Sequence, residues 1–453
     1  MFASDDLSRR HFLRAGAVSL GGVSLSGWLG DFARAAEDAP AKPKRACILL
    51  WMNGGPSQID TWDPKPEHAN GGPVKAIKTK VPGVQISEYL PKLAERVDKL
   101  AILRGMATKE ADHGRGSYLM RTGRVPGGPI RYPALGSFVG KELDGPDAEL
   151  PCFVSVAPFR FLSPEAYGPG FLGPRYAPLV VAEGGFDGPN PGGGQDVDRL
   201  LRVQDLDLPT GVSAKRGVDR ADFRDLLDSD FLADRESPAG EGHRTAYRRA
   251  NTLMRSASVK AFDLTMEKDA LRDKYGRSLF GQGCLLARRL VERGVPFVEV
   301  TLSSAPGVNN GIGWDTHGEN FETVKKLCGV LDPAWSALMD DLSDRGLLET
   351  TTVVWMGEFG RTPKIVADRK GRDHWANSWS TVLAGGGIKG GQVHGKTSAD
   401  GTEVKEHPVS VPDLLATVCK AVGLDPKKQN DSNVGRPIRL VEPAATPIKE
   451  VLS

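Results

Sequence analysis

The stretch RACILLWMN at residues 45–53 decides the fold, because it is an unbroken apolar run of strand length that ends in a polar residue. Four more runs of strand length are rich in β-branched or aliphatic residues, namely KLAILRG (99–105), VPFVEVTL (295–302), TTTVVWMGEF (350–359) and STVLAGGGI (380–388). Amphipathic stretches of helix length lie between them, such as SLFGQGCLLARRLVERG. This alternation predicts an α/β protein with a mostly parallel central sheet flanked by helices on both faces.

Length and charge narrow the class of protein further. With 453 residues, of which 40% are hydrophobic, the chain can bury a large core, and we expect one domain over residues 37–453. An irregular, loop-rich insertion is predicted at about 151–240, where segments such as GGFDGPNPGGG interrupt the strand and helix rhythm. The 59 basic and 57 acidic residues give a net charge of +2, which argues against nucleic acid as a partner.

The first 36 residues are typical of a twin-arginine signal peptide. Arg9 and Arg10 precede a mildly apolar segment, and the small-residue sequence FARAA follows it. An amphipathic N-terminal helix is the alternative interpretation. The signal predicts export to the periplasm or the extracellular space, and no later stretch approaches the roughly 18 apolar residues of a membrane span.

Five cysteines lie far apart in the chain and form no CxxC pattern. Cys47 falls within the first apolar run and Cys284 within a predicted helix. A thiol in such a place behaves as a small core side chain, so we expect no catalytic cysteine.

Polar side chains gather where the predicted strands end. In an open α/β sheet, ligands bind outside the carboxyl ends of the strands, because the loops converge there. The candidates are Asn53, Ser57 and Asp60 after the first run, His113, Arg115 and Ser117 after the second, Asp315 and His317 after the third, Glu358 and Arg361 after the fourth, and Arg372, Asp373 and His374 before the fifth.

The sequence GIGWDTHGEN carries Asp315 and His317 two residues apart between glycines. Carboxylate and imidazole together suit zinc, manganese or iron, since the mixture is too rich in nitrogen for calcium and lacks the thiolates of a structural zinc site. A polar turn would explain the same triplet. Combined with Glu358, Asp373 and His374, however, it predicts a divalent metal site.

These motifs carry a resemblance to a known family. NGGPSQIDTWDPKP, DHGRGSYLMRTGR, GWDTHGEN, GEFGRTPK and GRDHW, in this order, resemble the exported bacterial family named domain of unknown function 1501, from about residue 45 to the carboxyl end. That family resembles the sulfatases and the wider alkaline phosphatase superfamily. The resemblance implies a sulfatase-like fold and hydrolysis of phosphate or sulfate esters of a small molecule or glycan, with one or two metals at the strand ends.

The comparison also shows departures from the superfamily pattern. His113 stands where sulfatases carry a modified cysteine, and Asn53 stands where an aspartate ligand is usual, with Asp60 as a substitute. Glu358 replaces the aspartate of a DHG motif, and Phe359 follows it in place of histidine or asparagine. The departures favour one metal over two. The resemblance implies ligands at three further positions: Asp315, His317 and His374.

The resemblance also implies catalytic roles. His113 would act as nucleophile or general acid, with Ser117 and Ser57 as weaker alternatives. If Ser57 is not the nucleophile, its side chain would contact the substrate. Arginine side chains would neutralise the negative charge of the transferred group. The candidates are Arg115, Arg361 and Arg372, and for each of them a structural salt bridge is the alternative role.

A second class of function fits the same residues. The absence of the usual nucleophile and the presence of Phe359 favour a non-catalytic binding or scaffold protein built on a sulfatase-like fold. The retained set of carboxylates and imidazoles favours the metal-dependent hydrolase.

Overall fold

The computed structural model describes residues 45–145, 148–183, 196–204, 206, 208–233, 238–308 and 311–453. The signal peptide predicted at residues 1–36 and the domain start predicted at residue 37 lie outside these ranges. Within them, no helix combines the length and the apolarity needed to cross a membrane.

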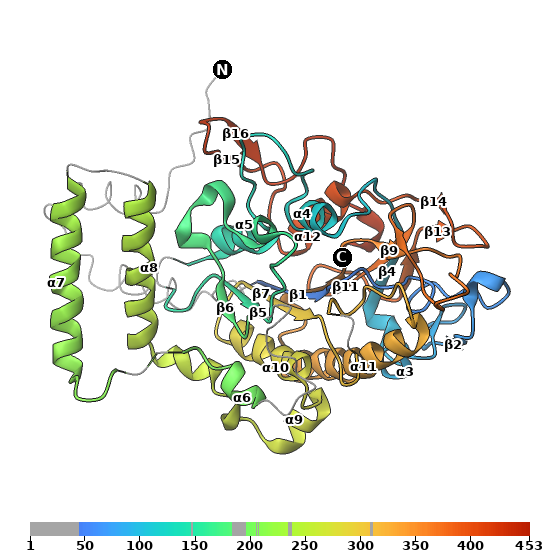
Figure 1. The fold of residues 1–453 in the computed structure, drawn as a ribbon, viewed down its shortest axis with the longest axis horizontal. Coiled ribbons are helices and arrows are strands. Elements are labelled where there is room, and N and C mark those ends of the chain that lie inside the picture. Colours follow the sequence, from blue (N-terminus) through green and yellow to red (C-terminus); the bar gives the residue numbers. More distant parts are fainter. Residues whose placement is uncertain are drawn as a thin grey trace, which may run out of the picture. The chain divides into compact units, whose positions relative to one another are not determined.

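An eight-stranded sheet lies at the centre of the described structure (Figure 1). All five predicted runs belong to it, which confirms the predicted class, while three short strands are additional. Across the sheet the order is β12 (Gln392–His394), β4 (Leu100–Met106), β11 (Trp379–Gly385), β8 (Thr351–Met356), β1 (Ala46–Met52), β7 (Phe297–Leu302), β5 (Phe153–Val156) and β6 (Leu179–Val181).

The sheet is parallel except for one strand. β1 pairs in parallel with β7 and β8, β5 with β6 and β7, and β12 with β4. β11 runs antiparallel to both β4 and β8. It therefore begins at the edge where its neighbours end, so the loop before β11 meets the loops that follow β1, β4, β7 and β8.

Helices cover both faces of the sheet, as predicted (Figure 1). Successive side chains of a strand point to opposite faces, and in β1 Ile48 and Leu50 enter one core cluster while Cys47 and Leu49 enter another. The first cluster includes residues of α3 (Pro91–Ala94), α10 (Leu279–Glu292) and α11 (Asn320–Asp344), and the second includes residues of α4 (His113–Thr122), α5 (Leu135–Leu143) and α12 (Val411–Ala421). All five cysteines are buried and unpaired, as expected.

The range 151–240 contains more regular structure than its glycine and proline content predicts. β5 and β6 join the sheet, and α7 (Ala214–Ala233) lies beside α8 (Pro238–Arg255), after the short α6 (Val197–Leu200) (Figure 1). The two strands are only four and three residues long, which gives too few residues for a visible pattern. Charged residues on all sides of α7 hide its helical period.

The remaining elements are short. α9 (Asp269–Tyr275) precedes α10, and four two-stranded pairs lie outside the main sheet: β2 (Ala76–Lys78) with β3 (Gln85–Ser87), β9 (Gly360–Arg361) with β10 (His374–Trp375), β13 (Lys396–Thr397) with β14 (Val404–Glu406), and β15 (Gln429–Asp431) with β16 (Pro437–Arg439). Turns of 3₁₀ helix occupy Ala69–Gly71, Val97–Lys99, Pro164–Tyr167, Gly170–Leu172, Pro174–Tyr176, Ala257–Phe262, Leu264–Met266 and Lys449–Val451.

A buried ion pair fastens α4 to the sheet. Arg121, in the last turn of α4, donates from Nη1 and Nη2 to the two carboxylate oxygens of Glu299 on β7, at 2.5 and 3.0 Å. Both side chains are almost completely buried. The guanidinium carbon also lies 4.0 Å from the ring centre of Trp51 and 3.7 Å from that of Tyr167. The charge is therefore shared between a carboxylate and two aromatic faces, which is how an arginine is tolerated in a core.

We predict that Arg121→Met lowers the free energy of unfolding by about 3 kcal/mol, because it leaves the Glu299 carboxylate buried without a counter-charge. Arg115→Met on the same helix is the matched control. Arg115 pairs with Glu110 at the surface, so its loss should cost less than about 1 kcal/mol. Chemical denaturation followed by circular dichroism measures both, and equal losses would contradict this account.

Candidate metal centre

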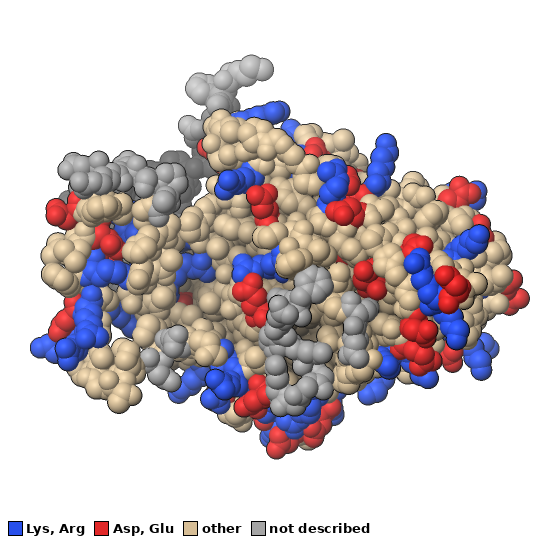
Figure 2. Space-filling view, in the orientation of Figure 1, with Lys and Arg blue, Asp and Glu red and all other residues tan. Residues whose placement is uncertain are grey.

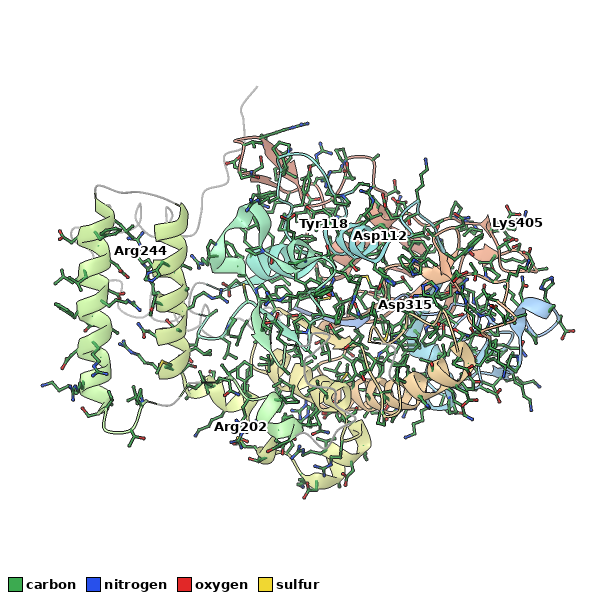
Figure 3. The ribbon with its side chains drawn as sticks, viewed as in Figure 1. Asp112, Tyr118, Arg202, Arg244, Asp315 and Lys405 are labelled. Carbon is green, nitrogen blue, oxygen red and sulfur yellow. The ribbon has the colours of Figure 1, made fainter. Side chains whose placement is uncertain are left out.

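Asp315, labelled in Figure 3, has several of the predicted residues around its carboxylate. Its Oδ1 atom is 3.3 Å from His113 Nε2, 3.1 Å from His317 Nε2 and 3.3 Å from His374 Nε2. The Nη2 atom of Arg361 lies 2.5 Å from the same oxygen. Three imidazoles from three different loops thus face one carboxylate oxygen, each with the same ring nitrogen.

The other nitrogen of each imidazole, Nδ1, contacts an oxygen atom of the protein. The contacts are His113 Nδ1 to Glu358 Oε1 at 2.7 Å, His317 Nδ1 to Asp373 Oδ1 at 2.6 Å, and His374 Nδ1 to the carbonyl oxygen of Ala111 at 2.7 Å. If a metal ion is bound between the rings and Asp315, each neutral ring would carry its proton on Nδ1, facing this oxygen, and Nε2 would offer its lone pair to the ion. This arrangement is the usual one for histidines that bind a metal.

Close backbone approaches bring the loops together. Gly54 has φ +107°, and a Cβ there would lie 2.4 Å from the backbone nitrogen of Asp315. A Cβ on Gly371 would lie 1.6 Å from the carbonyl oxygen of His317. Only glycine allows these approaches. The β9–β10 pairing then places His374 opposite Arg361, so that both reach Asp315.

The start of α4 and the residue after Glu358 fix the imidazoles in place. Asp112 caps α4 by accepting a hydrogen bond from the Arg115 backbone, and His113 is the first residue of the helix. Phe359 is completely buried, with its ring centre 5.0 Å from that of His113 and 4.7 Å from that of His374. Phe359 therefore packs against two of the imidazoles, a role that does not need the histidine or asparagine expected there.

Arg361, for which the resemblance implies charge neutralisation on a substrate, has its hydrogen bonds to the protein itself. Its side chain is completely buried. Besides Asp315, it donates to the carbonyl oxygens of Gly55 at 3.0 Å, Arg372 at 3.2 Å and Gly54. All of its nitrogens thus have protein partners, and its role is to orient Asp315.

Three other predicted residues form a separate buried network. Arg372 donates to both carboxylate oxygens of Asp60, at 2.8 and 3.1 Å, and Ser57 Oγ donates to Asp60 at 2.6 Å. Asn320 donates to the same carboxylate at 2.8 Å. Asp60, predicted as a metal ligand, and Ser57 and Arg372, predicted to contact the substrate, are thus bound to one another, and opposite charges from distant segments neutralise one another there.

Arg115 and Ser117 also lie apart from the imidazoles. Arg115 points to Glu110 at 2.6 Å with half of its side chain exposed, and Ser117 is buried in α4. Asn53 and Glu358 are buried as well, and among the described residues Asn53 Nδ2 and Glu358 Oε2 have no hydrogen-bond partner. Buried polar atoms nearly always have a partner, so these two favour a site that takes a ligand.

His113, Asp315 and His374 are the group best suited to hold a metal. One ligand atom from each lies within 4.8 Å of the others. Two imidazole nitrogens and a carboxylate oxygen match the donors of a zinc or related divalent site. His113, for which the resemblance implies the role of nucleophile or general acid, therefore also has the position of a candidate ligand. The sequence offers a signal for the position of His113, because this residue directly follows an N-cap aspartate. It offers no signal for the contact made by the backbone carbonyl of Ala111.

The charges of the site depend on one another. Burial opposes protonation of His113, but the carboxylates of Asp315 and Glu358 outweigh it and raise the pKa of His113 from 6.5 to about 9. Burial alone would raise the pKa of Asp315, but the imidazoles of His113 and His374 and the guanidinium of Arg361 hold it well below its usual range. Asp315 is therefore ionised at every physiological pH.

Comparison with known proteins identifies the family. A family model described as "Protein of unknown function (DUF1501)" matches residues 44–452. The chain belongs to this family, which confirms the resemblance stated from its motifs. Among curated proteins, none matches the sequence.

Solved structures with a similar arrangement come from the sulfatases and related enzymes. They include the PsFucS1 sulfatase from Pseudoalteromonas sp. (14% identity, covering 87% of this chain and 70% of that one, TM-score 0.39). The lipoteichoic acid synthase LtaP from Listeria monocytogenes has 12% identity, coverage of 91% and 77%, and a TM-score of 0.40. The phosphonate monoester hydrolase SpPMH from Silicibacter pomeroyi has 11% identity, coverage of 84% and 73%, and a TM-score of 0.36.

We predict that His113 keeps its proton at neutral pH in protein stripped of metal by a chelator. Its pKa is raised on folding, so its contribution to stability is complete below about pH 6.5 and is lost as the pH rises through about 9. Histidine NMR titration measures the pKa, with His113→Gln to assign the signal. A midpoint below pH 7 would contradict the proposed contacts with both carboxylates.

Proposed function

We propose that this protein is an exported, metal-dependent hydrolase of phosphate or sulfate esters. One observation supports the metal dependence. Three imidazole Nε2 atoms face Asp315 Oδ1, and each Nδ1 atom contacts another oxygen atom of the protein. The class of ester, on a small molecule or glycan, follows from the motif resemblance. Export to the periplasm or beyond follows from the twin-arginine pattern.

In this proposal His113, Asp315 and His374 hold a zinc, manganese or iron ion. Three protein ligands leave one coordination position for water or substrate, as in catalytic zinc sites. The bound ion would polarise the ester oxygen and lower the pKa of a water molecule. Glu358 and the Ala111 carbonyl keep the two rings oriented, and Arg361 keeps the carboxylate ionised.

His317 is then the proton-transfer group. Its side chain is 40% exposed, against 11% for His113 and 24% for His374, so it lies on the side from which a substrate arrives. The Asp373 carboxylate, 2.6 Å from Nδ1, fixes the orientation of the ring. Nε2 can therefore accept a proton from water or return it to the leaving oxygen.

A second function fits one specific distance. His317 Nε2 is as close to Asp315 Oδ1 as the other two imidazoles are, and it lies 3.0 Å from His374 Nε2. If His317 is a fourth ligand, the coordination shell is closed, as in structural zinc sites. The protein would then be a binding or scaffold protein whose metal stabilises the loops.

Metal content is the first test. Elemental mass spectrometry on protein purified without a histidine tag should find about one divalent ion per chain. His374→Ala should lose it, because two ligands cannot retain the ion through dialysis. His394→Ala is the control, since this histidine lies on β12 and should leave the metal content unchanged. A fully folded protein that contains no metal would contradict the proposal.

A second test separates hydrolase from scaffold. In the hydrolase, His317→Ala keeps its metal and loses about 100-fold or more in the hydrolysis of 4-nitrophenyl phosphate or sulfate, since general acid–base catalysis contributes that much. In the scaffold, His317→Ala loses metal and thermal stability together. Asp373→Asn should also lower the rate of hydrolysis, but by a smaller factor than His317→Ala, about tenfold.

A further inference from the structure

The outer face of α7 is apolar, although this helix lies at the edge of the protein. Phe223, Leu226 and Leu227 are 62%, 65% and 52% exposed. Their spacing of three and four residues puts them on one side of the helix. Single exposed apolar side chains are ordinary, but a continuous stripe on one face of a helix indicates a contact surface.

The inner face of α7, by contrast, is polar. Ala221, Arg224, Asp225 and Asp228 are the half-buried positions of this region. The Arg224 guanidinium lies 4.2 Å from the ring centre of Tyr247 on α8, and Asp228 Oδ2 lies 4.0 Å from His243 Nδ1. α7 thus has polar contacts on the side of its neighbour, while its large apolar side chains lie among exposed charged residues on the side of the water; an ordinary surface helix turns its apolar side chains to its neighbour.

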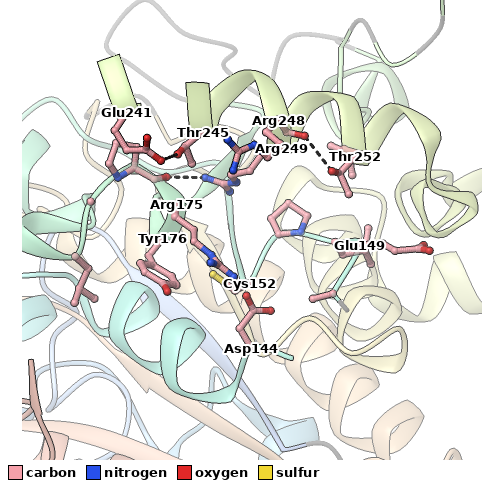
Figure 4. Close-up of a pocket in the computed structure, with 17 residues that line it drawn as sticks. Asp144, Glu149, Cys152, Arg175, Tyr176, Glu241, Thr245, Arg248, Arg249 and Thr252 are labelled. Carbon is pink, nitrogen blue, oxygen red and sulfur yellow. Dashed lines mark hydrogen bonds between the residues drawn. The ribbon is translucent and has the colours of Figure 1, made fainter. Parts of the chain in front are cut away.

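The helix α8 is fixed to the core, so the position of α7 is defined. Arg249 donates to the carbonyl oxygen of Pro174 at 2.9 Å, and Arg249 lines the cavity that Figure 4 shows. It also donates to the carbonyl oxygen of Ala177 at 3.0 Å. The cavity has a volume of about 580 Å³.

We propose that the outer face of α7 binds the same face of a second copy of this chain, with the two helices antiparallel. Both basic and acidic side chains lie at the surface of this part of the molecule (Figure 2). Three of the four basic side chains of α7 lie in its first half and three of the five acidic ones in its second half, an order that is self-complementary in an antiparallel pair. Arg220 and Asp230, both exposed, lie five residues on either side of position 225, and Phe223 and Leu227 lie two residues on either side. A twofold axis at the level of residue 225 therefore places Arg220 opposite Asp230 and Phe223 opposite Leu227.

The charge of α7 favours this partner over a membrane surface. The helix has four basic and five acidic side chains, whereas helices that lie on anionic membranes are rich in lysine and arginine. Twofold contacts use one patch on both copies, as this order of residues requires. The helix is about 30 Å long by the rise of 1.5 Å per residue, so the contact is small and the dimer should have a dissociation constant of about 1–100 µM.

Sedimentation velocity of the full chain without its signal, from about 1 to 200 µM, tests the proposal across that affinity range. We expect a concentration-dependent dimer. Leu226→Glu should abolish it over this range, because a charge would be buried in the contact. Val434→Glu is the matched control, since Val434 is 50% exposed in another part of the chain and should leave the dimer unchanged. Circular dichroism verifies that both variants are folded.

Charge exchange tests the antiparallel register. Arg220→Asp and Asp230→Arg should each weaken the dimer about tenfold, since each places like charges opposite one another twice. The double variant should recover the affinity, and an equimolar mixture of the two single variants should form a heterodimer. Wild-type protein that stays monomeric, a dimer unaffected by Leu226→Glu, or absence of recovery would each overturn the proposal, as would binding to phosphatidylglycerol vesicles that Leu226→Glu removes.

Discussion

The site depends on one electrostatic constraint: an ionised carboxylate, Asp315, lies in a largely enclosed position. Such a group is costly unless positive or proton-donating groups surround it. Arg361 supplies the permanent charge, and the imidazoles of His113, His317 and His374 surround the remaining side. Each surrounding group comes from a different part of the chain, so the loops that carry them must converge for Asp315 to be tolerated.

The direction of β11 makes this convergence possible. Were β11 parallel to its neighbours, the loop that carries Asp373 and His374 would lie at the opposite edge of the sheet. The antiparallel insertion brings it beside the loops after β4, β7 and β8. Arg361 and His374 then pair across β9 and β10, which ties the orienting guanidinium to a candidate ligand.

The helix α4 contributes both to the stability of the core and to the candidate metal site. α4 begins at His113, next to Asp315, and Arg121 in its last turn pairs with Glu299 inside the core. The ion pair fixes the helix on the sheet and thereby the position of the imidazole at its start. α7 is held differently: polar side chains on its inner face contact α8, and Phe223, Leu226 and Leu227 on its outer face are exposed.

The sequence by itself determined the sheet class and the loops of the site, because apolar runs such as residues 45–53 must be buried on both faces and their polar ends must meet at one edge. It also determined Asp315, His317 and His374 as candidates, because few residue types bind metals. Only the tertiary structure decided which polar residues neutralise each other. Asp60 and Arg372 look like site residues in the sequence, yet they pair with one another, and Arg361 orients Asp315. The position of His113 beside Asp315 and the strand β5 beside β7 depend on contacts between residues more than a hundred positions apart. Local sequence carries no record of such distant partners.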